Sequence, residues 1–231
     1  MITFNGIALE GVAPVMVEDI RVSPIEISPT VRQRPITWGA EYVRNHGNER
    51  TIAITFALLT MNRDQRAQQL MDITRWARSD KPAPLTLPNY HDMHIDCLCT
   101  SFPEPSTRQW WESKLRLVFT AYEPYFVSNS ERSVACGTAF STYGDAPPLV
   151  QIRHTAGSAT TDRSYSDGTN TITFTNIPAG NLVIDLNRQT AAVGDTSIMQ
   201  YYTFTSKFIE PIVGTQTITG QGTVYWRERW E

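Results

Sequence analysis

Near its C-terminal end the chain reads Gly180-Asn181-Leu182-Val183-Ile184-Asp185-Leu186-Asn187-Arg188. Short apolar runs of this kind, separated by turn sequences such as Gly194-Asp195 and Gly220-Gln221-Gly222, continue as far as Trp230. Each run is too short for a stable helix, and glycine, aspartate and asparagine supply the backbone conformations that tight turns need. The pattern predicts a surface-building β-module with no evident reaction centre.

The whole second half of the chain shows the same pattern. Its short apolar runs lie at residues 132–140, 148–155, 170–175, 181–186, 190–193 and 215–229. Such a density of short strands is typical of a β-sandwich. The polar segment Ser128–Glu131 precedes these runs, and we take it as the crossing between two domains, residues 1–130 and 131–231.

The first half contains longer strands and one helix. Apolar and polar residues alternate strictly over 50–58, which is typical of a half-buried strand, and further strands are expected at 15–27, bent at Pro24, at 92–99 and at 112–122. Asn62 is an expected N-cap, with Gln65 in the capping-box position, for a helix over 62–79. Prolines at 82 and 84 end the helical stretch, because proline cannot continue the hydrogen bonds of a helix.

Composition limits the classes of function. A chain of 231 residues with 41% hydrophobic residues can bury the cores of two domains. A net charge of −3 argues against a protein that grips nucleic acid through a broad basic face. The cysteines Cys97, Cys99 and Cys136 are expected to stay reduced. The sequence shows neither a signal-peptide pattern nor an apolar run long enough to span a bilayer, so we expect no membrane insertion.

The segment His91–Cys99 is the densest group of potential metal ligands. As a strand it would place Cys97 and Cys99 on one face and Asp92, His94 and Asp96 on the other. Ligands divided between two faces do not match the usual spacing of zinc sites, and we therefore favour a structural strand over a metal site.

Aspartates in the second half invite a glycosidase interpretation, because such enzymes need two facing carboxyl groups. Asp162, Asp167 and Asp195 lie in turn-like sequence, however, where aspartate commonly accepts backbone N–H groups, and Asp185 ends an apolar run. His154 has no accompanying nucleophile motif, and Gly220–Gly222 precedes no helix, so we interpret that segment as a hairpin turn. We predict no catalytic, cofactor-binding or metal-binding residues.

Tryptophan and arginine residues offer a different kind of site. They occur together at Arg108, Trp110, Trp111 and Arg116, and again at Trp226, Arg227, Arg229 and Trp230. This pairing is enriched at protein interfaces, although one tryptophan of each pair can equally fill a sandwich core. Trp230 is the contact residue we favour. The segment Thr30–Gly47 is long for a loop, and we expect it to reach a neighbouring subunit.

Taken in order, these features resemble the distal tail proteins, the tail-tip or baseplate hubs of phages with long, non-contractile tails. The similarity rests on the following segments: Phe4-Asn5-Gly6, the strand 50–58 with its helix, Tyr122–Phe126, Gly144–Pro148 leading into Leu149–Ile152, Asp167-Gly168, and Tyr225-Trp226-Arg227. No single motif is specific, but together they span the chain. The resemblance implies a mainly β protein, with an N-terminal tail-tube-like sandwich or barrel that carries one α-helix and a C-terminal galectin-like β-sandwich.

The resemblance also implies a structural virion protein and not an enzyme. Six copies would form a ring through residues 1–130 at the distal end of the tail, assembled in the host cytoplasm. The ring would join the tail-tube protein to tail-tip, lysin or fibre proteins and let DNA pass through an axial channel. Two alternatives stay open: a carbohydrate-binding adhesin that attaches to the host, and a tail-associated cell-wall hydrolase. The chain has no room for an inserted carbohydrate-binding module.

Overall fold

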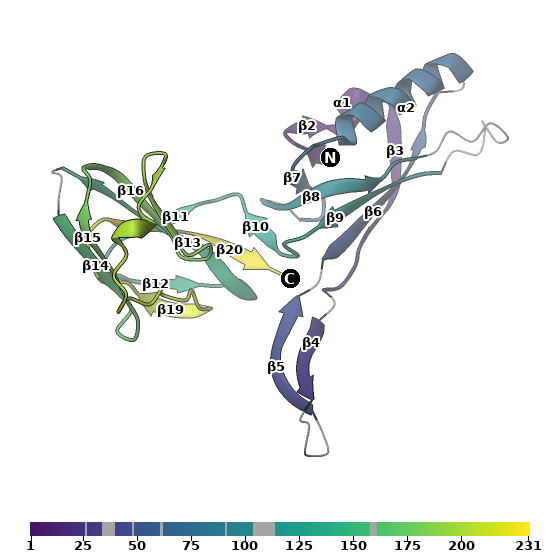
Figure 1. Cartoon of the computed structure of the whole chain (residues 1–231). Coiled ribbons are helices and arrows are strands. Elements are labelled where there is room, and N and C mark those ends of the chain that lie inside the picture. Colours follow the sequence, from purple (N-terminus) through teal and green to yellow (C-terminus); the bar gives the residue numbers. More distant parts are fainter. Residues whose placement is uncertain are drawn as a thin grey trace. The chain divides into compact units, whose positions relative to one another are not determined.

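The computed structural model describes residues 1–25, 27–33, 40–47, 49–60, 62–90, 92–103, 114–157 and 161–231 of the chain. These residues form two compact units, Met1–Phe126 together with Glu231, and Val127–Trp230. Both units are built mainly from antiparallel strands (Figure 1). The mainly β fold class that the sequence predicts is therefore confirmed.

The elements follow one another as in Figure 1. Up to the unit boundary they are β1 (Thr3–Phe4), β2 (Ile7–Ala8), α1 (Leu9–Val12), β3 (Val15–Val22), β4 (Ile27–Gln33), β5 (Ala40–Gly47), β6 (Arg50–Leu58), α2 (Arg63–Ala77), β7 (Ala83–Thr86), β8 (Met93–Ser101) and β9 (Leu115–Ala121). β10 (Phe126–Ser128) lies at the boundary itself. The second unit contains β11 (Arg132–Ala135), β12 (Ala139–Thr142), β13 (Ala146–Ala156), β14 (Thr161–Ser166), β15 (Thr171–Ile177), β16 (Gly180–Asp185), β17 (Thr190–Val193), β18 (Thr196–Ser197), the 3-10 helix η1 (Met199–Tyr201), β19 (Gly214–Thr217) and β20 (Thr223–Trp230).

Strand β6 is the centre of the first unit. It pairs antiparallel with β3 on one side and with β9 on the other. Its residues Ile52, Ile54 and Phe56 are fully buried, as the alternation over 50–58 predicts. Burying side chains of this size stabilises the fold by about 1.5–3 kcal/mol each. The strand thus fixes which face of the sheet meets the core.

Strand β8 connects this sheet to a second one. Its first half pairs with β7, where Cys97 lies opposite Ala83, and its second half pairs with β9, where Cys99 lies opposite Phe119. β7 in turn pairs with β1, and β1 with β2. The unit is therefore a bent antiparallel sheet in which β8 changes partner halfway along its length.

Helix α2 covers the inner face of the sheet. Asn62 is its N-cap, as predicted, because its side chain accepts the backbone N–H groups of Asp64 and Gln65. Trp76 packs edge-on against Phe119 of β9, at 6.3 Å between ring centroids, and against Phe4 at 5.8 Å. In the described part of the chain, neither α-helix has the length and apolar character needed to cross a bilayer.

Two expectations for the first unit are wrong in detail. The strand expected over 15–27 ends at Val22, and a separate strand begins at Ile27 after a break that contains Pro24. The expected long loop Thr30–Gly47 is instead largely a β-hairpin, since β4 pairs antiparallel with β5 from Ile27 opposite Gly47 to Gln33 opposite Ala40. Residues 34–39 of that segment lie outside the described residues.

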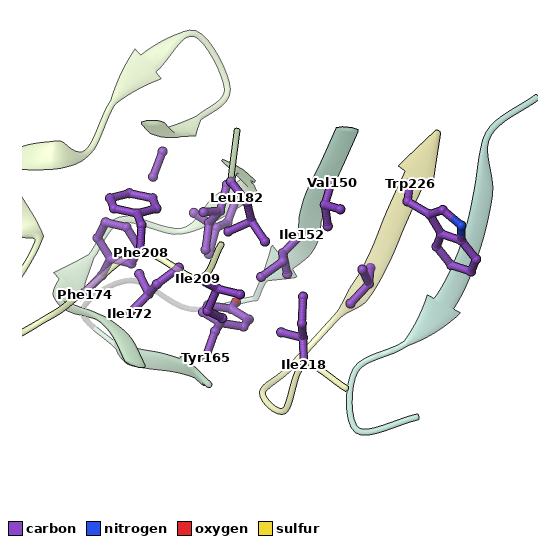
Figure 2. Close-up of a cluster of buried hydrophobic side chains, with 14 of the residues drawn as sticks. Val150, Ile152, Tyr165, Ile172, Phe174, Leu182, Phe208, Ile209, Ile218 and Trp226 are labelled. Atoms are coloured by element: carbon purple, nitrogen blue, oxygen red, sulfur yellow. The ribbon is translucent and has the colours of Figure 1, made fainter. Parts of the chain in front are cut away.

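The second unit is a two-layer sandwich. One layer has the strand order β18-β17-β16-β13-β20-β11, and the other contains the pairs β12–β19 and β14–β15, joined by a bridge between Ser166 and Thr219. Val150, Ile152 and Leu182 of the first layer face Tyr165 and Ile172 of the second across a shared apolar core (Figure 2). The β-sandwich predicted for the second half is thereby confirmed.

One strand of this sandwich has no counterpart among the predicted apolar runs. β14 reads Thr161-Asp162-Arg163-Ser164-Tyr165-Ser166, and its fully buried residue is Tyr165, with 1% of its surface exposed. β14 and β15 share a register in which Tyr165 lies opposite Ile172. A single aromatic residue therefore anchors an otherwise polar strand.

Candidate interaction surfaces

Most of the segment His91–Cys99, for which we favoured a structural strand over a metal site, lies in strand β8 (Met93–Ser101) and shows the predicted division between faces. Ile95 and Cys97 are fully buried, whereas Asp96 between them is exposed. Burial raises the pKa of Cys97 well above its usual value and raises the pKa of Cys99 to about 11. Both thiols are thus protonated at neutral pH in the protein without a metal. His91 lies outside the described residues, and among those described no group of three or more His, Cys, Asp or Glu side chains could hold a metal ion.

The aspartates of the glycosidase interpretation stabilise turns. The Oδ1 atoms of Asp162, Asp167 and Asp185 accept backbone N–H groups of Asn176, of Thr169 and Asn170, and of Arg188, respectively. These contacts, at 2.6–3.1 Å, confirm the turn interpretation for Asp162 and Asp167 and show the same kind of contact at Asp185, for which no turn was predicted. Asp195 lies in the turn between β17 and β18. The carboxylates of Asp162, Asp167 and Asp185 are therefore engaged with backbone N–H groups.

The segment Gly220–Gly222 is not a hairpin turn, and that interpretation was wrong. β19 before it pairs with β12, whereas β20 after it pairs with β11 and β13, so the segment passes from one layer of the sandwich to the other. Both glycines have positive φ, +142° and +104°, and a Cβ at Gly222 would lie 2.5 Å from the carbonyl oxygen of Arg153. Only glycine fits where the chain crosses so close to the neighbouring strand.

His154 lies in strand β13, opposite Leu182 of β16. Burial, together with the nearby positive charge of Arg163, lowers its pKa. The lowered pKa favours the neutral imidazole at neutral pH.

A polar network covers the outer face of the β13–β20 sheet. Arg153 makes two hydrogen bonds to the carboxylate of Glu131, at 2.7 and 2.9 Å, and its guanidinium lies 4.2 Å above the ring of Tyr225. Its Nε also donates to Gln151, which in turn donates to Asp185. Sugar recognition needs an open aromatic face and free polar groups, whereas here these groups satisfy one another. The network therefore fixes these side chains relative to one another on the surface of the sheet.

Glu228 is the buried acidic group of the second unit, with 5% of its surface exposed. Its Oε2 accepts the N–H groups of Tyr143 and Gly144, at 3.0 and 3.2 Å, and its Oε1 accepts the indole N–H of Trp226 at 3.2 Å. Arg132 lies 3.8 Å from the same carboxylate. Glu228 thus fastens the turn after β12 to strand β20, a role that the sequence interpretation missed.

The tryptophan and arginine residues singled out in the sequence differ in burial and in their contacts. Trp226 is 7% exposed and packs on Phe140 at 4.8 Å, so it fills the sandwich core at the end opposite Phe174 and Phe208 (Figure 2). Trp230 is half-buried at the end of β20. The arginines of the two groups also differ in position. Arg227, next to Trp226, lies 3.9 Å from Glu131, whereas Arg116, from the other group, is exposed on β9. Arg108, Trp110 and Trp111 lie outside the described residues.

The face of the first sheet that points away from α2 has small side chains on its central strand and charged side chains on the two strands beside it. Strand β6 contributes Thr51, Ala53, Thr55 and Ala57 to this face, and the register places Val118 of β9 opposite Ala53. Charged side chains lie directly opposite these small ones. Asp19 of β3 and Arg116 of β9 are both paired with Thr55, and Arg21 of β3 is paired with Ala53 and forms an ion pair with Asp19 at 2.6 Å. We call this the outer sheet face.

Comparisons with known proteins identify this fold. The chain is similar to the crystal structure of the Dit protein of phage SPP1, with a TM-score of 0.77 over 100% of this chain and 98% of that one, at 15% sequence identity. That protein is described as a paradigm of the hub adsorption apparatus in phages that infect Gram-positive bacteria. The resemblance to distal tail hub proteins drawn from the sequence is therefore confirmed at the level of the fold.

Two further structures of the phage P2 baseplate in its activated conformation, with calcium and with strontium, match at a TM-score of 0.46 and 9% identity. They cover 94% of this chain and 90% and 91% of theirs, but a score this low carries no weight here. A search of the sequence against protein-family models finds no match. A search against curated proteins likewise finds none.

Proposed function

We propose that this protein is a structural hub of a phage tail, which forms a ring at the distal end of the tail tube. The observation that carries the proposal is the end-to-end similarity of fold with the SPP1 Dit protein. The similarity extends over both units of this chain. The proposal gives the protein a role as a connector in the virion and not as an enzyme.

We assign ring closure to residues 1–130. The outer sheet face combines small side chains on β6 with charged side chains of both signs on β3 and β9, and heterologous contacts that close a rotation make a ring without forming fibres. The hairpin β4–β5 forms a two-stranded sheet of its own. Isolated two-stranded hairpins are marginally stable in water, so we expect this one to pack against a neighbouring copy.

Residues 131–231 form the second domain in this proposal, a galectin-like sandwich that contacts other tail-tip proteins. Six copies would surround an axial channel, with the tail-tube protein on one side and a lysin, fibre or receptor-binding protein on the other. DNA would pass without being held, because a net charge of −3 gives no strong attraction for phosphates. The ring would assemble in the host cytoplasm and remain in the virion.

The ring contacts can be tested by two variants of the full chain. Ala57→Glu places a carboxylate on the outer sheet face, and deletion of residues 32–46 removes most of the hairpin. Both are expected to convert rings into monomers, measured by mass photometry, while far-ultraviolet circular dichroism keeps its β-sheet signal. Met71→Glu, at an exposed position of α2, is the matched control and should leave the rings intact. Rings that survive both changes would contradict this assignment of the contacts.

A further inference from the structure

Phe204 is the most exposed large apolar side chain in the described part of the chain, at 103% of its reference surface. It lies between two residues that belong to the core region. Tyr202 before it stacks on Phe208 after it, with 5.2 Å between ring centroids, and Tyr202 also meets Phe174 edge-on. Phe174 and Phe208 lie together at one end of the core (Figure 2). The chain therefore leaves the core, presents one phenyl ring to solvent and returns.

The turn that presents Phe204 is fixed by hydrogen bonds. The N–H of Ser206 donates to the carbonyl oxygen of Thr203 at 3.0 Å, which closes a four-residue turn. The N–H of Thr203 donates to the carbonyl of Thr173 at 3.0 Å, and Ser206 Oγ accepts the N–H of Thr173 at 2.8 Å. Lys207 extends the attachment through its N–H to Thr171. A side chain held this way loses little backbone entropy on binding, which favours affinity.

The chemistry of the turn indicates the kind of partner. A phenyl ring has no hydrogen-bonding group, and the nearby hydroxyls of Thr203 and Ser206 lie 2.6 Å apart and are engaged with each other and with Thr173. Few groups are thus left to bind sugar hydroxyls. Lys207 is the single cation of the segment 199–209, too little charge to favour a phosphate or an anionic membrane. A rigid aromatic side chain of this kind fits an apolar pocket on another protein.

We propose that Phe204 is a preformed anchor whose ring inserts into an apolar pocket of a second, different protein of the tail tip. The proposal rests on the proposed function, because that function supplies the setting in which a second protein meets this sandwich. It adds to that function a specific contact residue, Phe204, and the kind of surface that receives its ring, an apolar pocket.

The anchor can be tested by photo-crosslinking. Phe204 is replaced by p-benzoylphenylalanine in the full chain, which is co-expressed with the tail proteins encoded beside it and irradiated. The expected result is one discrete adduct with a protein other than this chain. The same photoreactive residue at Met71, exposed on α2 in the first unit, is the control and should not give that adduct.

Substitutions of Phe204 then test whether its ring contributes to binding or only lies close to the bound protein. Phe204→Ser should weaken binding of the crosslinked protein by roughly thirtyfold, and Phe204→Leu should retain most of it. The thermal transition of both variants should be unchanged, since the ring makes no contribution to the core. An adduct with this chain itself, an adduct with glycan, the absence of a discrete adduct, or equal binding by the Ser and Leu variants would each overturn the proposal. If Phe204→Ser still forms rings, the anchor can fail while the proposed function stands.

Discussion

At the scale of single residues, Glu228 determines how the turn after β12 meets strand β20. Its carboxylate accepts from two backbone N–H groups and one indole N–H while 5% exposed. Glu228→Gln keeps the size but replaces one acceptor oxygen with a donor, so it should cost about 1–3 kcal/mol of unfolding free energy. Denaturant titration measures this loss, and hydrogen exchange should show faster exchange of the Tyr143 and Gly144 amides.

A matched control for Glu228 is available in the same unit. Glu210 is exposed, and Glu210→Gln should change the unfolding free energy by less than about 0.5 kcal/mol. Equal small effects of the two substitutions, with unaltered exchange of the turn amides, would show that Glu228 does not hold the turn.

For Tyr165, in contrast to Glu228, we expect that removing the buried polar group does not lower stability at pH 7. Its hydroxyl is buried without a hydrogen-bond partner among the described residues, and burial raises its pKa to about 12. Because the pKa is raised above the unfolded value of about 10, the contribution of Tyr165 to stability is complete below pH 10 and is lost as pH rises toward 12. Tyr165→Phe should therefore keep or slightly raise stability at pH 7 and flatten the loss between pH 10 and 12. Thermal melts across that pH range test this, and a loss of more than about 1 kcal/mol at pH 7 would contradict it.

At the scale of elements, the sequence predicts those strands and helices that have a clear alternation of residues or a recognisable capping residue. Strict alternation gave the bounds of β6, and Asn62 marked the start of α2 correctly. β14 was missed because its six residues are polar except for Tyr165, and no alternation can be seen in them. The hairpin β4–β5 was taken for a loop because its pairing depends on two segments that meet only in the fold.

The buried position of Glu228 did leave a signal in the sequence. The period of two along β20 places Val224, Trp226 and Glu228 on one face, and all three are buried. Glu228 lies between two arginines, and the sequence interpretation assigned it no role. The acceptor role itself could not be predicted, because the N–H groups of Tyr143 and Gly144 come from a segment more than 80 residues away.

The N-cap of α2 offers a prediction at the same scale. Asn62 accepts the N–H of Asp64 at 2.9 Å and that of Gln65 at 3.3 Å. Asn62→Ala should lower the unfolding free energy by about 1 kcal/mol, because these N–H groups lose their partner. Gln68→Ala on the exposed surface of the helix is the control, with an expected change below about 0.5 kcal/mol. Thermal denaturation compares the two, and an equal effect would show that the cap contributes nothing specific.

At the scale of the whole molecule, two mainly β units in one chain reproduce the fold of a phage tail hub protein. Nothing in the described aspartates, histidine or cysteines assembles a reaction centre, and the features that stand out are surfaces. The outer sheet face and the hairpin belong to the first unit, and the Phe204 turn belongs to the second. Separate surfaces on separate units suit a connector that must bind copies of itself and other proteins at once.

The most direct test of this account is the mass of the purified protein in solution, measured by mass photometry and accompanied by negative-stain images. A hub ring predicts a particle of about six times the 26.1 kDa chain mass, with rotational symmetry and a central opening. A single species at the mass of one chain over the full concentration range, with no ring in the images, would contradict it.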